Sequence, residues 1–327
     1  MRITPRFVSL LLCLVNAALA SQFESEEVVP VRINSRIGGR FWKRSEENPI
    51  FTLKAFGRNL TLNLIPDTSF LSPAFNIQGV SAGYTATLRS ASGAQPELRS
   101  DHNGSKNRTQ ESEGRLRRCF FSGNVGQDEN SLVAVSLCSG IFGSFISEGK
   151  EYLIEPKLRS GQRPDSAEQL HVIRRRILAE NRGVSLLFTH GGSDARREAR
   201  RKRFVSEPRF IETLAVADST MTHFYGDEIK HYVLTLMSMV AQLYKHPSIK
   251  NSVNIVVVKM LVVEDEEAGP ELSSNGGVAL RNFCSWQQLF NPPSQRHPEH
   301  YDTAMLFTRE VRGGPLACCL LVMSSGF

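Results

Sequence analysis

The stretch VNIVVVKMLVV, from Val253 to Val263, decides the fold of this chain. It is a long run of mostly β-branched apolar residues, interrupted only by Asn254 and Lys259. Such a run is typical of a strand that is buried on both faces, as in a parallel sheet covered by helices. We therefore expect it to lie inside an α/β sheet.

The segments on either side of this strand alternate between strand and helix patterns. Phe210 to Ala217 (FIETLAVA) reads as a strand, and Asp227 can cap a helix that ends before Pro247. After the central strand, residues 277–290 have a helical pattern and residues 302–308 (DTAMLFT) a strand pattern. This order predicts a mostly parallel sheet.

A basic segment precedes this region. The chain has a formal net charge of +6, and residues 174–203 contain ten Arg or Lys and three Asp or Glu, a local surplus of +7. The rest of the chain is therefore close to −1. Nucleic-acid binding needs basic residues spread over a folded face, so the composition argues against it.

The basic segment has three interpretations: a contact surface, a nuclear address or a cleavage site. A furin-like proprotein convertase reads several Arg or Lys side chains on an exposed, flexible strand. The segment ends in four basic residues of this kind, Arg200, Arg201, Lys202 and Arg203, which a convertase would recognise. We therefore expect cleavage after Arg203, so that Phe204 begins a mature chain. Arg174 to Arg176 form a weaker second candidate.

The N-terminus favours cleavage over a nuclear address. Arg2 and Arg6 precede an apolar run, Phe7 to Val15, and Ala18-Leu19-Ala20 has the small-x-small pattern of a signal-peptidase site. Residues 1–20 are thus predicted to be a secretory signal, with a buried N-terminal helix as the alternative. No later stretch has the ~20 apolar residues of a membrane span, so we expect a secreted protein.

Glycosylation and cysteine patterns agree with export. Sequons begin at Asn59, Asn103 and Asn107. Cys119 and Cys138 lie in two strand-like runs and can bridge neighbouring strands in an oxidising compartment. Three other mature cysteines remain, an odd number with no evident pairing: Cys284, Cys318 and Cys319.

Residues 21–203 are predicted to be a pro-segment with a β-rich core to about residue 156 and a polar, basic linker after it. Short apolar or alternating runs separated by turn residues support the β-rich assignment. These runs are PIFTLKAF, NLTLNLIP, YTATLRS, CFFSG, SLVAVSLC and GSFISEGKEYLIEP.

The region from Arg203 to Arg309 contains four long, specific stretches: RFVSEPRFIETLAVADSTM, YKHPSIKNSVNIVVVKMLVVEDEEAGPE, LRNFCSWQ and HPEHYDTAMLFTR. Together they closely resemble the start of the reprolysin-type, metzincin catalytic domain of the ADAMTS family, in particular its proteoglycan-cleaving group. The pro-segment, with EYLIEP and the polybasic site, is similar too. The resemblance implies a secreted protease of the extracellular matrix that acts on proteoglycans.

The family's chemistry is zinc-dependent peptide hydrolysis. Three histidines of HExxHxxGxxH hold the metal, and a Glu accepts a proton from the bound water. None of the eight histidines of this sequence forms HExxH. His297 and His300 have the wrong spacing and are read as a surface loop, and His231 and His246 as core-edge or capping residues. We predict no catalytic residue and no zinc ligand in this chain.

The resemblance ends near residue 310. Residues 311–327 (VRGGPLACCLLVMSSGF) resemble nothing in the family. The expectation is a truncated or alternatively spliced product or a gene-model error, with residues 204–310 as the N-terminal part of a catalytic domain. The alternative is a real short tail that completes the sheet.

The resemblance also implies a partial calcium site. Reprolysin-type domains bind structural calcium through residues that match Glu212 and Asp302, and carboxylate oxygens suit Ca²⁺. A further family Asp is Gln295 in this chain, so two solvated carboxylates are the alternative. Cys284 resembles a family cysteine whose partner lies beyond the break. A latency thiol is not expected if Cys119 and Cys138 pair.

Two functions remain open at this point. The first is the zymogen of a secreted zinc metalloendopeptidase, inactive as this chain because HExxH is missing. The second is a non-catalytic secreted protein whose pro-segment is a folding or binding module.

Overall fold

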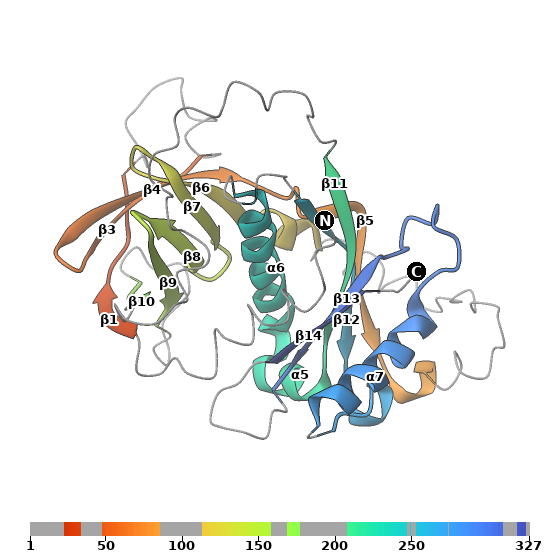
Figure 1. Ribbon diagram of the computed structural model, residues 1–327. Helices are drawn as coiled ribbons and strands as arrows, with labels where there is room; N and C mark the ends of the chain where they lie inside the picture. Colours follow the sequence, from red (N-terminus) through yellow and green to blue (C-terminus); the bar gives the residue numbers. More distant parts are fainter. Residues whose placement is uncertain are drawn as a thin grey trace.

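In the part of the chain that the computed structural model describes, two β-sheets are accompanied by the helices α5 (Ser219–Tyr225), α6 (Ile229–Lys245) and α7 (Gly276–Gln287) (Figure 1). The structure describes residues 23–33, 48–85, 113–157, 169–176, 208–246, 249, 253–273, 275–309 and the backbone of 319–324. We refer to described residues 23–176 as the N-terminal region and to described residues 208–324 as the C-terminal region. The predicted signal, the polybasic site and the sequons at Asn103 and Asn107 lie outside the described residues.

The first sheet is formed by nine antiparallel strands of the N-terminal region, in the order β1-β10-β9-β8-β7-β6-β4-β3-β2. The strands are β1 (Phe23–Val28), β2 (Val31–Arg32), β3 (Ile50–Ala55), β4 (Arg58–Pro66), β6 (Phe120–Val125), β7 (Asp128–Ser136), β8 (Phe142–Ser147), β9 (Lys150–Pro156) and β10 (His171–Arg176). The predicted β-rich core is therefore present.

This sheet curls, because β1 at one edge contacts β3 near the other. The Phe56 N–H after β3 bonds to the Glu26 carboxylate on β1. Alternate residues point inward and form one apolar core inside the curl. Its largest fully buried side chains are Tyr152, Phe145, Leu53, Leu62, Leu64, Ile154 and Ile173.

The second sheet has the order β14-β13-β11-β12-β5. β11 (Arg209–Ala217), β12 (Val253–Val263) and β13 (Thr303–Thr308) are parallel. The predicted α/β sheet with mostly parallel strands is present, and β12 lies inside it, between β11 and β5. β14 (Cys319–Ser324) pairs antiparallel with β13, so the backbone of the tail extends the sheet.

One strand of the second sheet comes from the N-terminal region. β5 (Leu71–Val80) pairs in parallel with β12 and forms the opposite edge from β14. The sequence runs did not predict this strand. They predicted one at 84–90 instead, where residues 82–85 form a helical turn and the rest lies outside the described residues.

Three helices cover the two faces of the second sheet (Figure 1). α5 (Ser219–Tyr225) and α6 (Ile229–Lys245) belong to one apolar core, and α7 (Gly276–Gln287) to the other. The Asp218 side chain caps α5 by accepting the Met221 N–H. The predicted capping by Asp227 is wrong, because Glu228 is the N-cap of α6 and Asp227 lies in a preceding 3-10 turn.

The apolar cores explain why these segments are helical. α6 turns one apolar stripe, including Val233, Leu234 and Met237, toward the sheet. α7 presents Phe283 and Trp286 to the other face. Neither these helices nor any other within the described ranges has the length and apolar composition needed to cross a bilayer.

Candidate functional site

The two predicted calcium ligands lie on neighbouring strands of the second sheet. Glu212 is on β11, and Asp302 directly precedes β13. The Asp302 carboxylate accepts the Glu212 N–H at 3.0 Å, and the Asp302 N–H donates to the Glu212 carbonyl at 2.9 Å. The structure thus brings the pair together.

The pair has the electrostatics of a weak cation site. Burial, and then the charge of Asp302, raise the pKa of the Glu212 carboxyl, and nearby His300 opposes them. A bound cation would relieve the repulsion between the two carboxylates. However, Gln295 is exposed, and no group of three or more acidic, His or Cys side chains gathers anywhere in the described ranges. Two carboxylates alone fall short of the 6–8 oxygens that Ca²⁺ takes.

The described histidines do not fit a zinc centre, because no three potential metal ligands gather among the described residues and several of the histidines have other partners. The Ile141 N–H donates to Nε2 of His171. Because Nε2 is the acceptor in this ring, Nδ1 of His171 carries the proton and donates to the Gln169 carbonyl. In the loop before β13, the Glu299 N–H donates to Nδ1 of His297 at 3.2 Å. We derive no catalytic step through zinc from these residues.

Only the weaker of the two candidate cleavage sites lies within the described residues. Arg174 to Arg176 lie in β10, between β1 and β9. Their partners are Glu155 at 2.5 Å, Glu24, and Glu151 at 3.3 Å. A convertase needs a flexible strand, so this second candidate is not supported. Of the sequons, Asn59 is exposed on β4.

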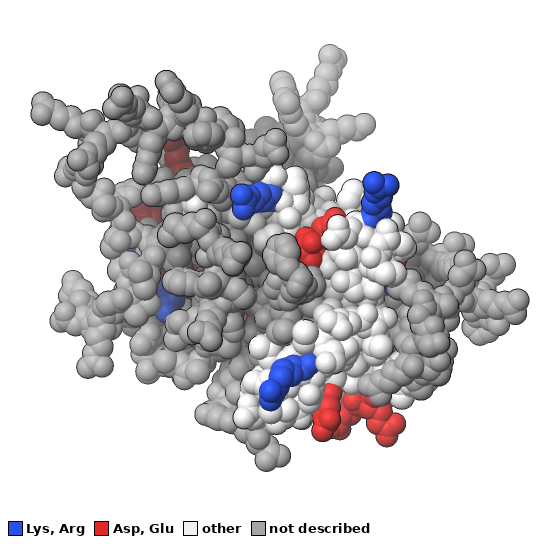
Figure 2. Space-filling model, turned by 45° about the vertical axis from the view of Figure 1, so that its right-hand side comes forward, with Lys and Arg blue, Asp and Glu red and all other residues white. Residues whose placement is uncertain are grey.

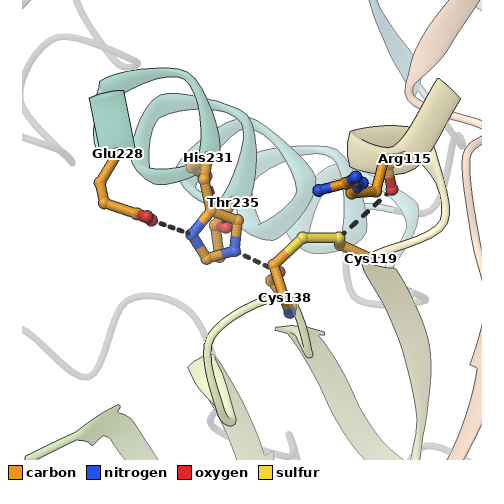
Figure 3. Close-up of a disulfide and its surroundings, with 7 residues drawn as sticks. Arg115, Cys119, Cys138, Glu228, His231 and Thr235 are labelled. Atoms are coloured by element: carbon orange, nitrogen blue, oxygen red, sulfur yellow. Dashed lines mark hydrogen bonds and ion pairs between the residues drawn. A yellow bond between two sulfur atoms is a disulfide. The ribbon is translucent and has the colours of Figure 1, made fainter. Parts of the chain in front are cut away.

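A disulfide joins Cys119 and Cys138 (Figure 3). It connects the segment before β6 with the segment after β7, so both cysteines belong to the N-terminal region. Cys284 on α7 is a free thiol and is partly exposed. Cys318 and the side chain of Cys319 lie outside the described residues.

His231 of α6 lies beside this disulfide (Figure 3). Its Nε2 contacts the Ser136 hydroxyl of β7, and its Nδ1 is 3.5 Å from the Glu228 carboxylate. Phe142 and Phe120 of the N-terminal region lie against the ring, with centroids at 6.0 and 6.4 Å. The predicted core-edge position is right, but the sequence did not reveal that these partners come from the N-terminal region.

A second polar contact links the two regions near β5. Glu299 accepts a hydrogen bond from the Asn76 side chain of β5 at 2.9 Å and forms an ion pair with Lys259 of β12 at 2.5 Å. Lys259 is a charged residue within the apolar run of β12. Its position in that run is the one feature of the sequence that indicates a buried charge pair. Its partner is 40 positions further along the chain and could not be identified from spacing.

Charges on the surface in front in Figure 2 are few and scattered. The described part of that face is mostly without charged side chains, with isolated basic groups, acidic atoms in its upper middle and further acidic atoms at its lower edge. The described part of this face thus shows no continuous patch of one sign.

Comparisons with known proteins place the sequence in a family. No model of a protein family matches the chain. A disintegrin and metalloproteinase with thrombospondin motifs 8 from Homo sapiens is 40% identical over 328 residues, which cover 90% of this chain. The proteins numbered 1 from Mus musculus and 15 from Homo sapiens are each 37% identical, over 97% and 93% of the chain.

The chain spans about a third of the length of these relatives: 33%, 34% and 33%. The similarity includes both the N-terminal and the C-terminal region, since it covers 90% or more of this chain. The chain therefore belongs to the ADAMTS family.

Proposed function

We propose that these 327 residues comprise the pro-segment and the N-terminal part of the catalytic domain of a secreted zinc metalloendopeptidase. The observation that carries this proposal is the similarity to three metalloproteinases over 90% or more of the chain. The parallel sheet with helices on both faces is consistent with the start of such a domain. The substrates we propose are extracellular matrix proteins such as proteoglycans.

We further propose that these residues do not hydrolyse peptides by themselves. The sequence contains no HExxH, and the described histidines do not converge. A zinc ion with an open position supplies the Lewis acid and the activated water in this class of enzyme. A metal-to-protein ratio measured by plasma mass spectrometry should be far below one for zinc, and a peptidase assay should detect no chelator-sensitive activity. Stoichiometric zinc would overturn this part of the proposal.

Maturation is proposed to occur by convertase cleavage after Arg203. Secretion from mammalian cells, followed by N-terminal sequencing, should give a fragment that begins at Phe204. Replacing Arg200 and Arg203 by Ala should abolish this fragment. The matched control replaces Arg174 and Arg176 by Ala and should leave it unchanged, because those residues lie in β10. A fragment that persists in the first variant would contradict the assignment.

The second candidate function is a non-catalytic folding or binding module. One observation favours it: β5 supplies an edge strand to the sheet of the C-terminal region. The two functions are compatible, since a pro-segment can serve as a module for its own catalytic domain. Chelator-sensitive activity in the peptidase assay above would exclude a purely non-catalytic chain.

A further inference from the structure

β5 belongs to one part of the chain by sequence and to the other by hydrogen bonding. The chain leaves the first sheet after β4, passes through β5 in the second sheet, and returns to the first sheet at β6. The two regions are connected by the backbone of residues 177–207. The disulfide between described cysteines does not add a second covalent link, because both of its cysteines lie in the N-terminal region. A cut in that linker would leave β5 in a separate polypeptide from β12.

The backbone of β5 is paired with β12 at Leu71 and again from Asn76 to Val80, with a shift of register between them. The Val257 N–H donates to the Phe70 carbonyl at 2.7 Å, and the Glu264 N–H donates to the Val80 carbonyl at 3.0 Å. Between them, Asn76 to Val80 are in parallel register with residues 259–263. Without β5, these donors on the β12 edge would lose their partners.

The side chains of β5 enter both apolar cores of the C-terminal region. Leu71 and Phe75 pack into the core on the α6 face, and both are at most 6% exposed. Val80 is fully buried in the core on the α7 face. Burial of such side chains is the main source of affinity between two polypeptides.

The outer edge of β5 is held by the N-terminal region. Glu113 accepts the Ile77 N–H at 3.1 Å, and the Arg117 guanidinium donates to the Ser72 carbonyl at 3.0 Å. Arg117 also lies over the Phe75 ring, with its guanidinium carbon 5.5 Å from the centroid. β5 is thus fixed on one side by residues 113–117 and on the other by β12.

Contacts around α6 add to this junction. The Lys245 ammonium donates to the Ser69 hydroxyl at 2.6 Å, and the Phe142 and Tyr232 rings stack with centroids 5.7 Å apart. Together with the Glu299 bridge to Asn76, these contacts link the N-terminal region to the C-terminal region.

We propose that β5 holds the two polypeptides together after cleavage in the linker, so that the cut product is a two-chain complex joined by a shared parallel sheet. The β12 edge is then a docking surface for an extended strand, and its occupant is the pro-segment's own β5. This proposal rests on the proposed cleavage after Arg203 but concerns the association of the two fragments once the chain is cut.

The test uses the full chain with residues 200–203 replaced by the recognition sequence of a site-specific protease. After complete cutting, the two fragments should co-elute in a 1:1 ratio on size exclusion and separate only in denaturant. Separate elution under native conditions would overturn the proposal. The result does not depend on convertase cleavage, so the two proposals fail independently.

Two variants test whether the contacts of β5 keep the cut fragments associated. Phe75→Ala with Asn76→Ala should raise the rate at which the cut fragments separate by at least tenfold. The control, Leu53→Ala, removes a fully buried side chain from the core of the first sheet, away from β5. It should lower the melting temperature without changing that rate. Equal rates of fragment separation for both variants would show that other contacts keep the fragments associated, which would contradict the proposal.

Hydrogen exchange tests the proposal without any substitution in the junction. The Val257 and Glu264 amides should be as protected in the cut protein as in the uncut protein, because both donate to carbonyls next to or within β5. Loss of protection at both amides on cutting would show that β5 has left the sheet, which would overturn the proposal.

Discussion

At the scale of single residues, the junction between the two regions contains ionisable groups that are rarely buried. His231 is 9% exposed and Lys259 is 8% exposed. Each of them has neighbours from both regions. His231 contacts Ser136 of the N-terminal region and Glu228 of the C-terminal region. Lys259 pairs with Glu299 of the C-terminal region, which also accepts a hydrogen bond from Asn76 of the N-terminal region. Substitutions at these two positions should therefore affect the association of the regions as well as local packing.

We predict that acidification destabilises the protein through His231. Burial lowers the pKa of His231 below its ordinary value of 6.5, although the Glu228 charge opposes this shift. The stabilisation is therefore complete above about pH 6.5 and is lost as the pH falls below that value. Urea unfolding between pH 8 and pH 5 should show a smaller loss for His231→Gln than for the unmodified chain.

His171 provides the control for this measurement. Burial also lowers its pKa, so acidification changes its contribution to stability in the same direction. It lies within the N-terminal region and contacts Gln169 and Ile141 there. In the cut protein, His231→Gln should reduce the pH dependence of fragment association, whereas an unchanged dependence would show that His231 does not act at the junction.

The Lys259 and Glu299 pair gives a second prediction at this scale. Removing one member of a buried pair costs about 3–5 kcal/mol, and the partial exposure of Glu299, 31% for its side chain, reduces this to roughly 1–3 kcal/mol. Glu299→Gln should lower the free energy of unfolding by that amount. Lys259→Met combined with Glu299→Gln should recover part of it, since no unpaired ammonium remains buried. A double variant less stable than the single variant would contradict this account.

At the scale of elements, apolar periodicity predicted those strands and helices whose conformation is determined by their local sequence. β11, β12, β13, α6 and α7 all lie within a few residues of their predicted bounds. The same reasoning missed β5, because LSPAFNIQGV includes Pro, Gly and several polar residues and has no clear period. Its strand conformation depends on β12, on Glu113 and on Arg117, all distant in sequence. The pairing of Glu212 with Asp302 followed from family resemblance, while the contact of His231 with β7 needed the structure.

The packing of α7 is tested by truncating its central aromatic residue. Phe283 is fully buried on the face of the sheet opposite α6. Phe283→Ala should lower the free energy of unfolding by about 3–5 kcal/mol, because it removes apolar contacts and leaves a cavity. Phe210→Ala is the matched control, since Phe210 is 64% exposed, and it should change stability by less than about 0.5 kcal/mol in urea unfolding. Similar losses for both variants would contradict the packing of α7 against this face.

The disulfide gives a prediction about the link between β6 and β7. Cys119 and Cys138 enclose a loop with a sequence separation of 19. Removing a bridge over a loop of this length should cost about 3 kcal/mol, mainly through the entropy of the unfolded chain. Thermal unfolding of Cys119→Ser with Cys138→Ser should show this loss, and added reductant should then have no further effect. A variant that still responds to reductant would point to another disulfide.

At the scale of the whole molecule, the described residues form two sheets that are connected by β5, a strand of the N-terminal region that pairs in the second sheet, and by contacts of α6. The first sheet is completed within the N-terminal region, whereas the second draws strands from both regions. The predicted boundary in sequence at Arg203 therefore does not coincide with the boundary between the two sheets in hydrogen bonding. Composition could place the linker, because charge and apolar pattern change there. It could not assign β5, because strand partners are chosen by tertiary packing.

The strand order also has a consequence for synthesis on the ribosome. Val28 of β1 pairs with His171 of β10, so the first strand to emerge must wait until nearly all of the N-terminal region has been translated. β5 waits longer still, since its partner β12 emerges after the linker. Nascent chains in which translation stalls before Val253 should therefore expose β5 to holdase chaperones, and release of those chaperones should coincide with the appearance of β12 outside the exit tunnel.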